Sequence, residues 1–184
     1  MTEKEKMLAG QLYNALDPQL AHARRIARNM LKEFNDSRDE EGEKRAQISK
    51  ELFGETGENL WIEPPFFCDY GANIFAGDNV YFNFNCVILD VAEVRIGNNV
   101  FCAPNVQIYT ATHPLDFQMR RDGLESGEPI EISDDVWIGG GAILCPGVKI
   151  GARAVIGAGS VVTKDVPEGV LAFGNPCRVV RALE

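Results

Sequence analysis

The sequence predicts a mainly β protein: a solenoid of hexapeptide repeats, preceded by an α-helical segment and interrupted by a protruding loop. Helix signals fill residues 1–60, apolar residues recur every six positions from about residue 70, and a charged stretch at about 109–131 breaks the recurrence. A six-residue period fits neither a helix nor an alternating strand, whereas a coil with three six-residue faces explains it. We therefore expect a helical segment over 1–60 and a β-solenoid domain with a C-terminal tail over 61–184.

The N-terminal segment shows helix-start signals and one apolar stripe. Thr2 and Glu5 have capping-box spacing, and Asp17 before Pro18 fits an N-cap with proline at the first helical position. Asp17 could instead contact a ligand, but capping explains it without one. A third helix is expected over about 38–53, closed by Gly54. The stripe at helical spacing comprises Leu20, Ala23, Ala27, Met30, Leu31 and Phe34.

The hexad register defines the interior of the predicted solenoid. Six lead residues stand six positions apart: Ile132, Ile138, Leu144, Ile150, Ile156 and Val162. Four positions after each comes a mostly small or β-branched residue: Val136, Ala142, Val148, Ala154, Ser160 and Val166. The upstream register is looser and contains two extra residues between 88 and 96; its positions are Tyr70, Ala76, Phe82 and Ile88, then Ile96, Cys102 and Ile108. Corners that need positive φ fit Asp78-Asn79, Asn98-Asn99 and Asp134-Asp135.

Composition excludes several classes of function. The 184 residues include 18 basic and 27 acidic side chains, a net charge of −9, which argues against a nucleic-acid partner. The N-terminus lacks a signal-peptide pattern, and no apolar run is long enough to cross a membrane. The five cysteines are odd in number and form no CxxC pair, so we expect neither disulfides nor zinc but a reducing cytoplasm; they are Cys68, Cys86, Cys102, Cys145 and Cys177.

Several stretches together resemble one enzyme family. They include "IGGGAILCPGVKIGARAVIGAGSVVTKDVP", "NIFAGDNVYFNFNCVILDV", "IYTATHP", "LYNALDPQL" and "GNPCRVVR". The chain is similar along nearly its whole length to the hexapeptide-repeat acetyltransferases, in particular to the maltose and galactoside O-acetyltransferase group. The resemblance implies a left-handed parallel β-helix, acetyl-CoA as co-substrate, no required metal, and a homotrimer with active sites between subunits. It also implies a small sugar as the acetyl acceptor.

His113 is the candidate catalytic base. It is the only histidine of the repeat half, and imidazole ordinarily titrates close to neutral pH, which suits proton removal from a hydroxyl. Pro114 restricts it to extended geometry where the chain leaves the coil. Outside its motif it would be an ordinary loop histidine, as we take His22 to be, but the histidine of "TATHP" matches the family's base.

The acceptor-side candidates come from the resemblance. Asn83 matches an asparagine that holds the acceptor, although a turn asparagine is the alternative. Asp69 and Asp90 match polar positions on the acceptor side and could equally be corner residues. Glu125, in the loop, stands where galactoside enzymes carry a methionine, and Val91 where they carry an acidic residue, so the chain follows the maltose-type pattern at both.

The donor-side candidates also come from the resemblance. Gly140 matches a position whose amide serves the thioester oxygen, and Ala158 matches a pantetheine contact, with core packing as the alternative. Four residues match coenzyme A contacts, and a local basic cluster is what an acidic protein needs to bind phosphates; they are Thr163, Lys164, Arg178 and Arg181. A solvent-exposed charged face is the alternative for these residues. Trp137 could wall the donor groove or pack against its neighbours.

The interrupting loop at about 109–131 provides what a smooth prism lacks, a place to enclose a sugar. Loops of this length in a compact fold are usually functional. Three alternatives to a maltose-type enzyme remain: a non-catalytic scaffold, a metal-dependent lyase on the same fold, and an acetyltransferase with a different acceptor, such as a galactoside. A lyase would need several histidine ligands, and the repeat half has one. We expect direct transfer, without an acyl-enzyme.

Overall fold

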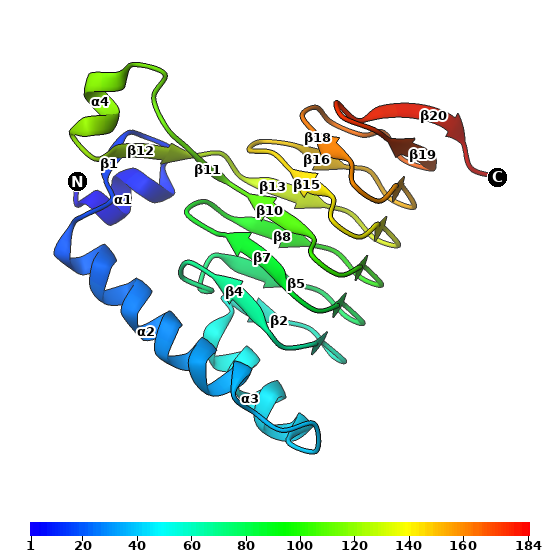
Figure 1. Cartoon of the computed structure of the whole chain (residues 1–184), viewed down its shortest axis with the longest axis horizontal. Coiled ribbons are helices and arrows are strands. Elements are labelled where there is room, and N and C mark those ends of the chain that lie inside the picture. Colours follow the sequence, from blue (N-terminus) through cyan, green and yellow to red (C-terminus); the bar gives the residue numbers. More distant parts are fainter.

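The computed structural model describes residues 1–184, and most of the chain winds into a three-sided prism of parallel strands (Figure 1). The first face holds β4 (Phe66–Cys68), β7 (Cys86–Leu89), β10 (Gln107–Tyr109), β15 (Ile143–Leu144) and β18 (Val161–Val162). The second holds β2 (Glu55–Thr56), β5 (Ile74–Ala76), β8 (Val94–Ile96), β13 (Ile130–Ile132) and β16 (Lys149–Ile150). The third holds β3 (Trp61–Ile62), β6 (Tyr81–Phe82), β9 (Phe101–Cys102), β14 (Trp137–Ile138), β17 (Val155–Ile156), β19 (Val170–Phe173) and β20 (Arg178–Ala182).

The predicted left-handed parallel β-helix is confirmed, and the downstream hexads fill its interior. All six lead residues from Ile132 to Val162 are buried, and so are the six residues that follow them by four positions. The upstream register needs one correction, because Tyr70 is not an interior lead residue. The lead positions of the first coil are Ile62 and Cys68, which pair with Phe82 and Ile88 of the next coil. Tyr70 instead packs in a small cluster outside the prism.

The coils change length along the prism. Cys68 pairs with Ile88 and Ile88 with Ile108, so these coils are 20 residues long, whereas Leu144 pairs with Val162, which is 18 residues away. The extra residues of the early coils all lie at one corner, between the first and second faces. We call it the insertion corner; it holds residues 69–73, 90–93 and 110–129.

The corner between the second and third faces is built from stacked polar side chains. Asn79 and Asn99 adopt positive φ values of 56° and 55°, as the sequence predicted, and Asp135 follows with 59°. Each amide donates to the side chain one coil further on: Asn59 to Asn79, Asn79 to Asn99, and Asn99 to Asp135, all at 3.0 Å. This asparagine ladder fixes the stacking of four successive coils.

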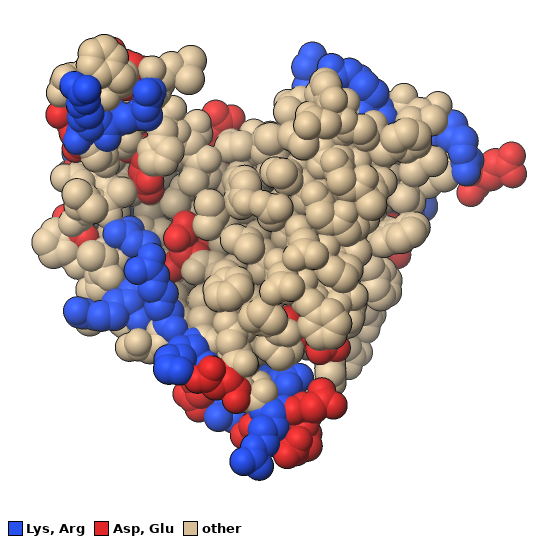
Figure 2. Space-filling view, in the orientation of Figure 1, with Lys and Arg blue, Asp and Glu red and all other residues tan.

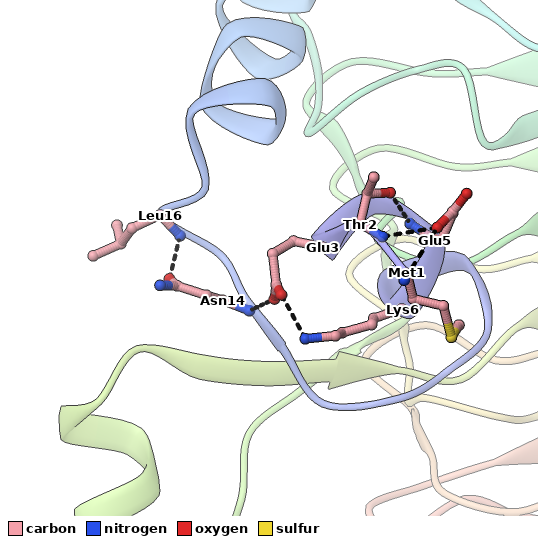
Figure 3. Close-up of polar contacts among 7 residues, drawn as sticks. All are labelled: Met1, Thr2, Glu3, Glu5, Lys6, Asn14 and Leu16. Atoms are coloured by element: carbon pink, nitrogen blue, oxygen red, sulfur yellow. Dashed lines mark hydrogen bonds and ion pairs between the residues drawn. The ribbon is translucent and has the colours of Figure 1, made fainter.

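The N-terminal segment contains three helices, α1 (Glu3–Leu8), α2 (Pro18–Asn35) and α3 (Gly42–Leu52). Both predicted helix starts are confirmed. Thr2 and Glu5 form a capping box at the start of α1 (Figure 3). At the start of α2, the Asp17 carboxylate accepts the N–H groups of Gln19 and Leu20. The buried side of α2 lies beside the first coils (Figure 1). The solenoid begins at β2, with Glu55, six residues before the expected boundary at 61.

The predicted loop protrudes from the prism (Figure 1), but it has secondary structure of its own. It contains β11 (Ala111–Thr112), α4 (Phe117–Arg121) and β12 (Leu124–Gly127). β12 pairs in an antiparallel sense with β11 and also with β1 (Tyr13–Asn14), so the N-terminal segment and the loop share one small sheet. None of the helices has the length and apolar character needed to span a membrane.

Candidate active site

The insertion corner is organised by two buried polar side chains. The Asp90 carboxylate accepts the N–H groups of Asp69 at 3.0 Å and Tyr70 at 2.9 Å, and the Thr110 hydroxyl accepts from Ala92 and donates to the carbonyl of Leu89. Burial raises the pKa of Asp90 to about 7, with the N–H donors opposing the rise. Asp90 has no exposed surface, so it cannot contact a ligand directly. Its hydrogen bonds instead hold the backbone of Asp69 and Tyr70 in position.

Above these groups lies a cavity of about 220 Å³ between α2, the insertion corner and the loop. The structure brings three of the sequence-predicted residues together on its wall: Asp69, His113 and Glu125. Residues that the sequence reading missed complete the wall, namely Arg24, Arg28 and Tyr70. The four-residue spacing of the two arginines on one helix was the only available signal for them, because that spacing places both on the same face.

The catalytic candidate stands at the mouth of this cavity. The His113 side chain is 57% exposed, the Glu125 side chain is 15% exposed, and Nε2 of His113 lies 3.8 Å from Oε2 of Glu125. Burial and the Glu125 carboxylate raise the pKa of Asp69, while the guanidinium groups of Arg24 and Arg28 oppose the rise. The cavity therefore presents one imidazole, two carboxyl groups and two guanidinium groups, a set that can both accept and donate hydrogen bonds.

Arg24 is held in place by its own contacts. It donates to the Tyr70 hydroxyl and to the carbonyl of Ala15, both at 2.6 Å, and its guanidinium lies 5.6 Å from the centre of the Tyr70 ring. His22 lies on the same helix but outside the cavity, exposed and 2.9 Å from the Arg25 guanidinium. Its interpretation as an ordinary surface residue is consistent with that position.

Asn83 lies away from the His113 cavity in this chain. It follows β6 at the corner between the third and first faces, which we call the glycine corner, and its side-chain oxygen accepts the N–H of Phe84 at 2.8 Å. Gly140 and Ala158 occupy the same corner in later coils. Gly140 lies between β14 and β15, and Ala158 lies between β17 and β18. Neither the Gly140 N–H nor the Ala158 N–H has an acceptor within the chain, so both are free for a ligand.

The four predicted coenzyme A contacts lie at the C-terminal end of the prism. Thr163 and Lys164 directly follow β18, and Arg178 and Arg181 lie in β20. All four are exposed, and none of the three basic side chains is engaged in an ion pair. Figure 2 shows basic side chains at this end of the molecule, beside a broad uncharged surface. Cations without acidic partners are available to phosphates.

The cysteines show no sign of activation. Cys86 and Cys102 are buried in the interior of the prism, and burial raises the pKa of Cys86 to about 11 and holds that of Cys102 well above its ordinary value. Since the thiolate is the nucleophilic form, both side chains are unreactive near neutral pH. Nowhere in the structure do three histidine, cysteine or acidic side chains gather closely enough to hold a metal ion.

Two family models match the chain: a maltose acetyltransferase hexapeptide capping motif at residues 6–57, and a bacterial transferase hexapeptide of six repeats at 129–164. A maltose O-acetyltransferase structure from Clostridium difficile is 51% identical with a TM-score of 0.99, covering 100% of this chain and 98% of that one. A hexapeptide-repeat acetyltransferase from Vibrio cholerae, complexed with acetyl coenzyme A, is 41% identical with a TM-score of 0.92 and full coverage of both chains (100%). Galactoside O-acetyltransferase of Escherichia coli is 44% identical, covering 100% of this chain and 90% of that one.

Proposed function

The chain belongs to the hexapeptide-repeat acetyltransferases, and on that premise we propose that it transfers an acetyl group from acetyl-CoA to a hydroxyl of a small sugar of the maltose or glucose type. The observation that carries the proposal is the placement of His113 at the mouth of a polar cavity beside Glu125 and Asp69. The five cysteines of the chain are all free, which supports a location in a reducing compartment, the cytoplasm.

His113 acts as the general base of a direct transfer. Acetyl-CoA supplies an acetyl group that is activated as a thioester. The imidazole removes the proton of the acceptor hydroxyl as the hydroxyl oxygen attacks the thioester carbonyl carbon. When the carbon–sulfur bond then breaks, the imidazolium gives that proton to the departing thiolate. The free N–H of Gly140 donates to the oxyanion that forms between these steps. The protonated, buried thiols of Cys86 and Cys102 support a route without an acyl-cysteine.

The cavity suits a small polyol. A sugar hydroxyl both donates and accepts hydrogen bonds, and the wall offers carboxyl groups as acceptors and the guanidinium of Arg28 as a donor. Val91 is buried, and Glu125 faces His113, so two positions that separate the maltose type from the galactoside type contribute an apolar wall and a carboxylate here. These features favour a glucose or maltose acceptor over a galactoside.

The donor binds along the glycine corner and the C-terminal end of the prism. Gly140 and Ala158 offer N–H groups to the thioester and the pantetheine amides, and Thr163, Lys164, Arg178 and Arg181 contact the nucleotide and its phosphates. The related structure complexed with acetyl coenzyme A supports this co-substrate. Trp137, whose side chain is exposed on the third face, could wall the same groove.

The active protein is a homotrimer whose sites lie between subunits. Asn83 and Gly140 lie at the glycine corner, whereas His113 lies at the insertion corner, so a second copy has to bring the two sets together. The outer surfaces of the prism support such an assembly. The outward residues of the first four strands of the third face are aromatic, namely Trp61, Tyr81, Phe101 and Trp137. Figure 2 shows a first face almost free of charge. The second face is charged, with Glu55, Arg95, Glu131 and Lys149.

The test is a panel of glucose, maltose, galactosides and amines with acetyl-CoA, followed by release of the free thiol. We expect turnover of glucose or maltose, and a kcat about 10²–10⁴-fold lower in His113→Ala with acetyl-CoA binding unchanged by calorimetry. His22→Ala is the matched control, because it removes an exposed imidazole outside the cavity, and it should keep wild-type turnover. Normal turnover in His113→Ala would contradict the base assignment, and a completely silent panel would favour a non-catalytic scaffold.

A further inference from the structure

A buried phenol from the N-terminal segment contacts the carboxylate that faces His113. Tyr13 has no exposed surface, and its hydroxyl donates to Oε1 of Glu125. The other oxygen of that carboxylate, Oε2, is the atom that lies 3.8 Å from Nε2 of His113. Three polar groups from two distant parts of the chain therefore stand in a row, from the interior to the mouth of the cavity.

We propose that Tyr13 is a positioning residue of the active site: it fixes the Glu125 carboxylate so that this carboxylate orients the His113 imidazole and stabilises it once it is protonated. The proposal rests on the function proposed above, since it needs His113 to act as the base. It makes the N-terminal segment part of the acetyl-transfer site.

The direction of the hydrogen bond follows from the surroundings of the phenol. Burial, followed by the hydrogen bond to Glu125 and the charge of that carboxylate, raises the pKa of Tyr13, so the hydroxyl keeps its proton and donates. This leaves Oε2 free to face the imidazole. The other charged groups on the cavity wall are Asp69, Arg24 and Arg28, and none of them has a hydrogen bond to Glu125.

The backbone holds this geometry from both sides. Tyr13 pairs directly with Glu125 across the β1–β12 ladder, and the Tyr13 ring packs with Met7, Leu20 and Val91. Figure 3 shows how α1 secures β1: the Glu3 carboxylate accepts the N–H of Asn14 and also pairs with Lys6. The aromatic ring thus anchors the segment, while the hydroxyl alone reaches the carboxylate, and a Tyr→Phe change separates the two roles.

The experiment compares Tyr13→Phe, Glu125→Gln, the double variant and Thr2→Ala in steady-state kinetics. We expect Tyr13→Phe to lower kcat by about 3- to 10-fold, the effect of losing one hydrogen bond, with an unchanged KM for acetyl-CoA. In the Glu125→Gln background the same change should have no further effect on kcat. Thr2→Ala is the matched control, because it removes the N-cap of α1 and loosens the same segment while leaving the Tyr13 hydroxyl in place.

A second measurement does not depend on turnover. The chain has two histidines, so the ring ¹⁵N signals of His113 can be followed by NMR with His22 as an internal reference. We expect the His113 signals to move in Tyr13→Phe and to stay in place in Thr2→Ala. Unmoved His113 signals, an equal loss of kcat in Thr2→Ala, or an undiminished loss in the Glu125→Gln background would each overturn the proposal. Normal turnover in His113→Ala would instead contradict the proposed function, which keeps the two failures distinct.

Discussion

The buried carboxyl of Asp90 links the stability of the insertion corner to pH. An aspartate in the unfolded chain titrates near 3.8, whereas burial raises the pKa of Asp90 in the folded protein to about 7. Between these values folding takes up a proton. Below them both states are protonated and the group contributes no difference, and above them the folded state bears the full cost of a buried charge. Stability from this group therefore falls as the pH rises from about 4 to about 7.

We expect Asp90→Asn to remove this dependence, because an amide does not titrate. The Tm of the wild type relative to Asp90→Asn should be higher at pH 5 than at pH 8, by at least about 2–4 °C, the shift that 1 kcal/mol gives in a chain of this size. Thermal denaturation followed by circular dichroism at both pH values measures the difference. Asp36→Asn, at an exposed side chain, is the control. A pH-independent difference between wild type and Asp90→Asn would contradict the assignment.

At the scale of elements, the asparagine ladder makes two separate contributions to the solenoid. Asn99 adopts a φ of 55°, which a residue with a Cβ atom rarely does, and its side chain accepts from Asn79 and donates to Asp135. Asn99→Gly keeps the conformation and removes the side-chain bonds, whereas Asn99→Ala removes the bonds and adds strain.

We therefore expect Asn99→Ala to be the less stable of the two, by about 1 kcal/mol in the free energy of unfolding, and both to be less stable than the wild type. Chemical denaturation monitored by circular dichroism gives the three values. Equal stability of the glycine and alanine variants would show that the positive φ carries no cost at this corner.

The same scale shows what the sequence could predict. The hexads from Ile132 to Val162 fix their strands because a shift of one residue would turn every lead side chain outward. Tyr70 was misplaced because Ala76 follows Cys68, the last lead residue of the first coil, by eight positions in place of six, and the spacing alone does not show which residues form the insertion. β1 gave no signal at all: two residues have no periodicity, and Tyr13 pairs with Glu125, far away in the chain.

Site residues that lie in recognisable local sequence motifs could be predicted, whereas site residues outside such motifs were missed. His113 lies in a distinctive sequence at the base of the break in the repeat, and Asp69 and Glu125 share its cavity. Arg24 and Arg28 were missed because a basic pair on a helix normally faces solvent, and only the packing of α2 against the insertion corner turns them toward a ligand. That packing depends on tertiary contacts between residues that are distant in sequence.

For the whole molecule, the separation of Asn83 from His113 makes a testable statement about assembly. If each site combines His113 of one subunit with Asn83 of another, then an Asn83→Ala chain and a His113→Ala chain complement each other. Co-refolding an equal mixture should give about a quarter of wild-type activity, because each contribution is intact in half of the positions. Each variant alone should stay near its own low level.

Thiol release from the co-refolded mixture, with each variant refolded alone as the control, measures the recovery, and the mass in solution confirms the trimer. Activity that equals the average of the two separate variants would place both residues in one subunit. It would then contradict a shared site, although the acetyltransferase activity itself could remain.

Confining every length change to a single vertex has a consequence for how such a scaffold can diversify. The three faces keep their length from one coil to the next, while the insertion corner accommodates two extra residues in each of two coils and about twenty in the coil that carries the loop. In the proposed binding mode, a different loop at this corner would leave the donor contacts at Gly140 and Ala158 unchanged. If the proposed sites are correct, acceptor specificity and donor binding can vary independently, because another alcohol requires a change in only one continuous stretch of the chain.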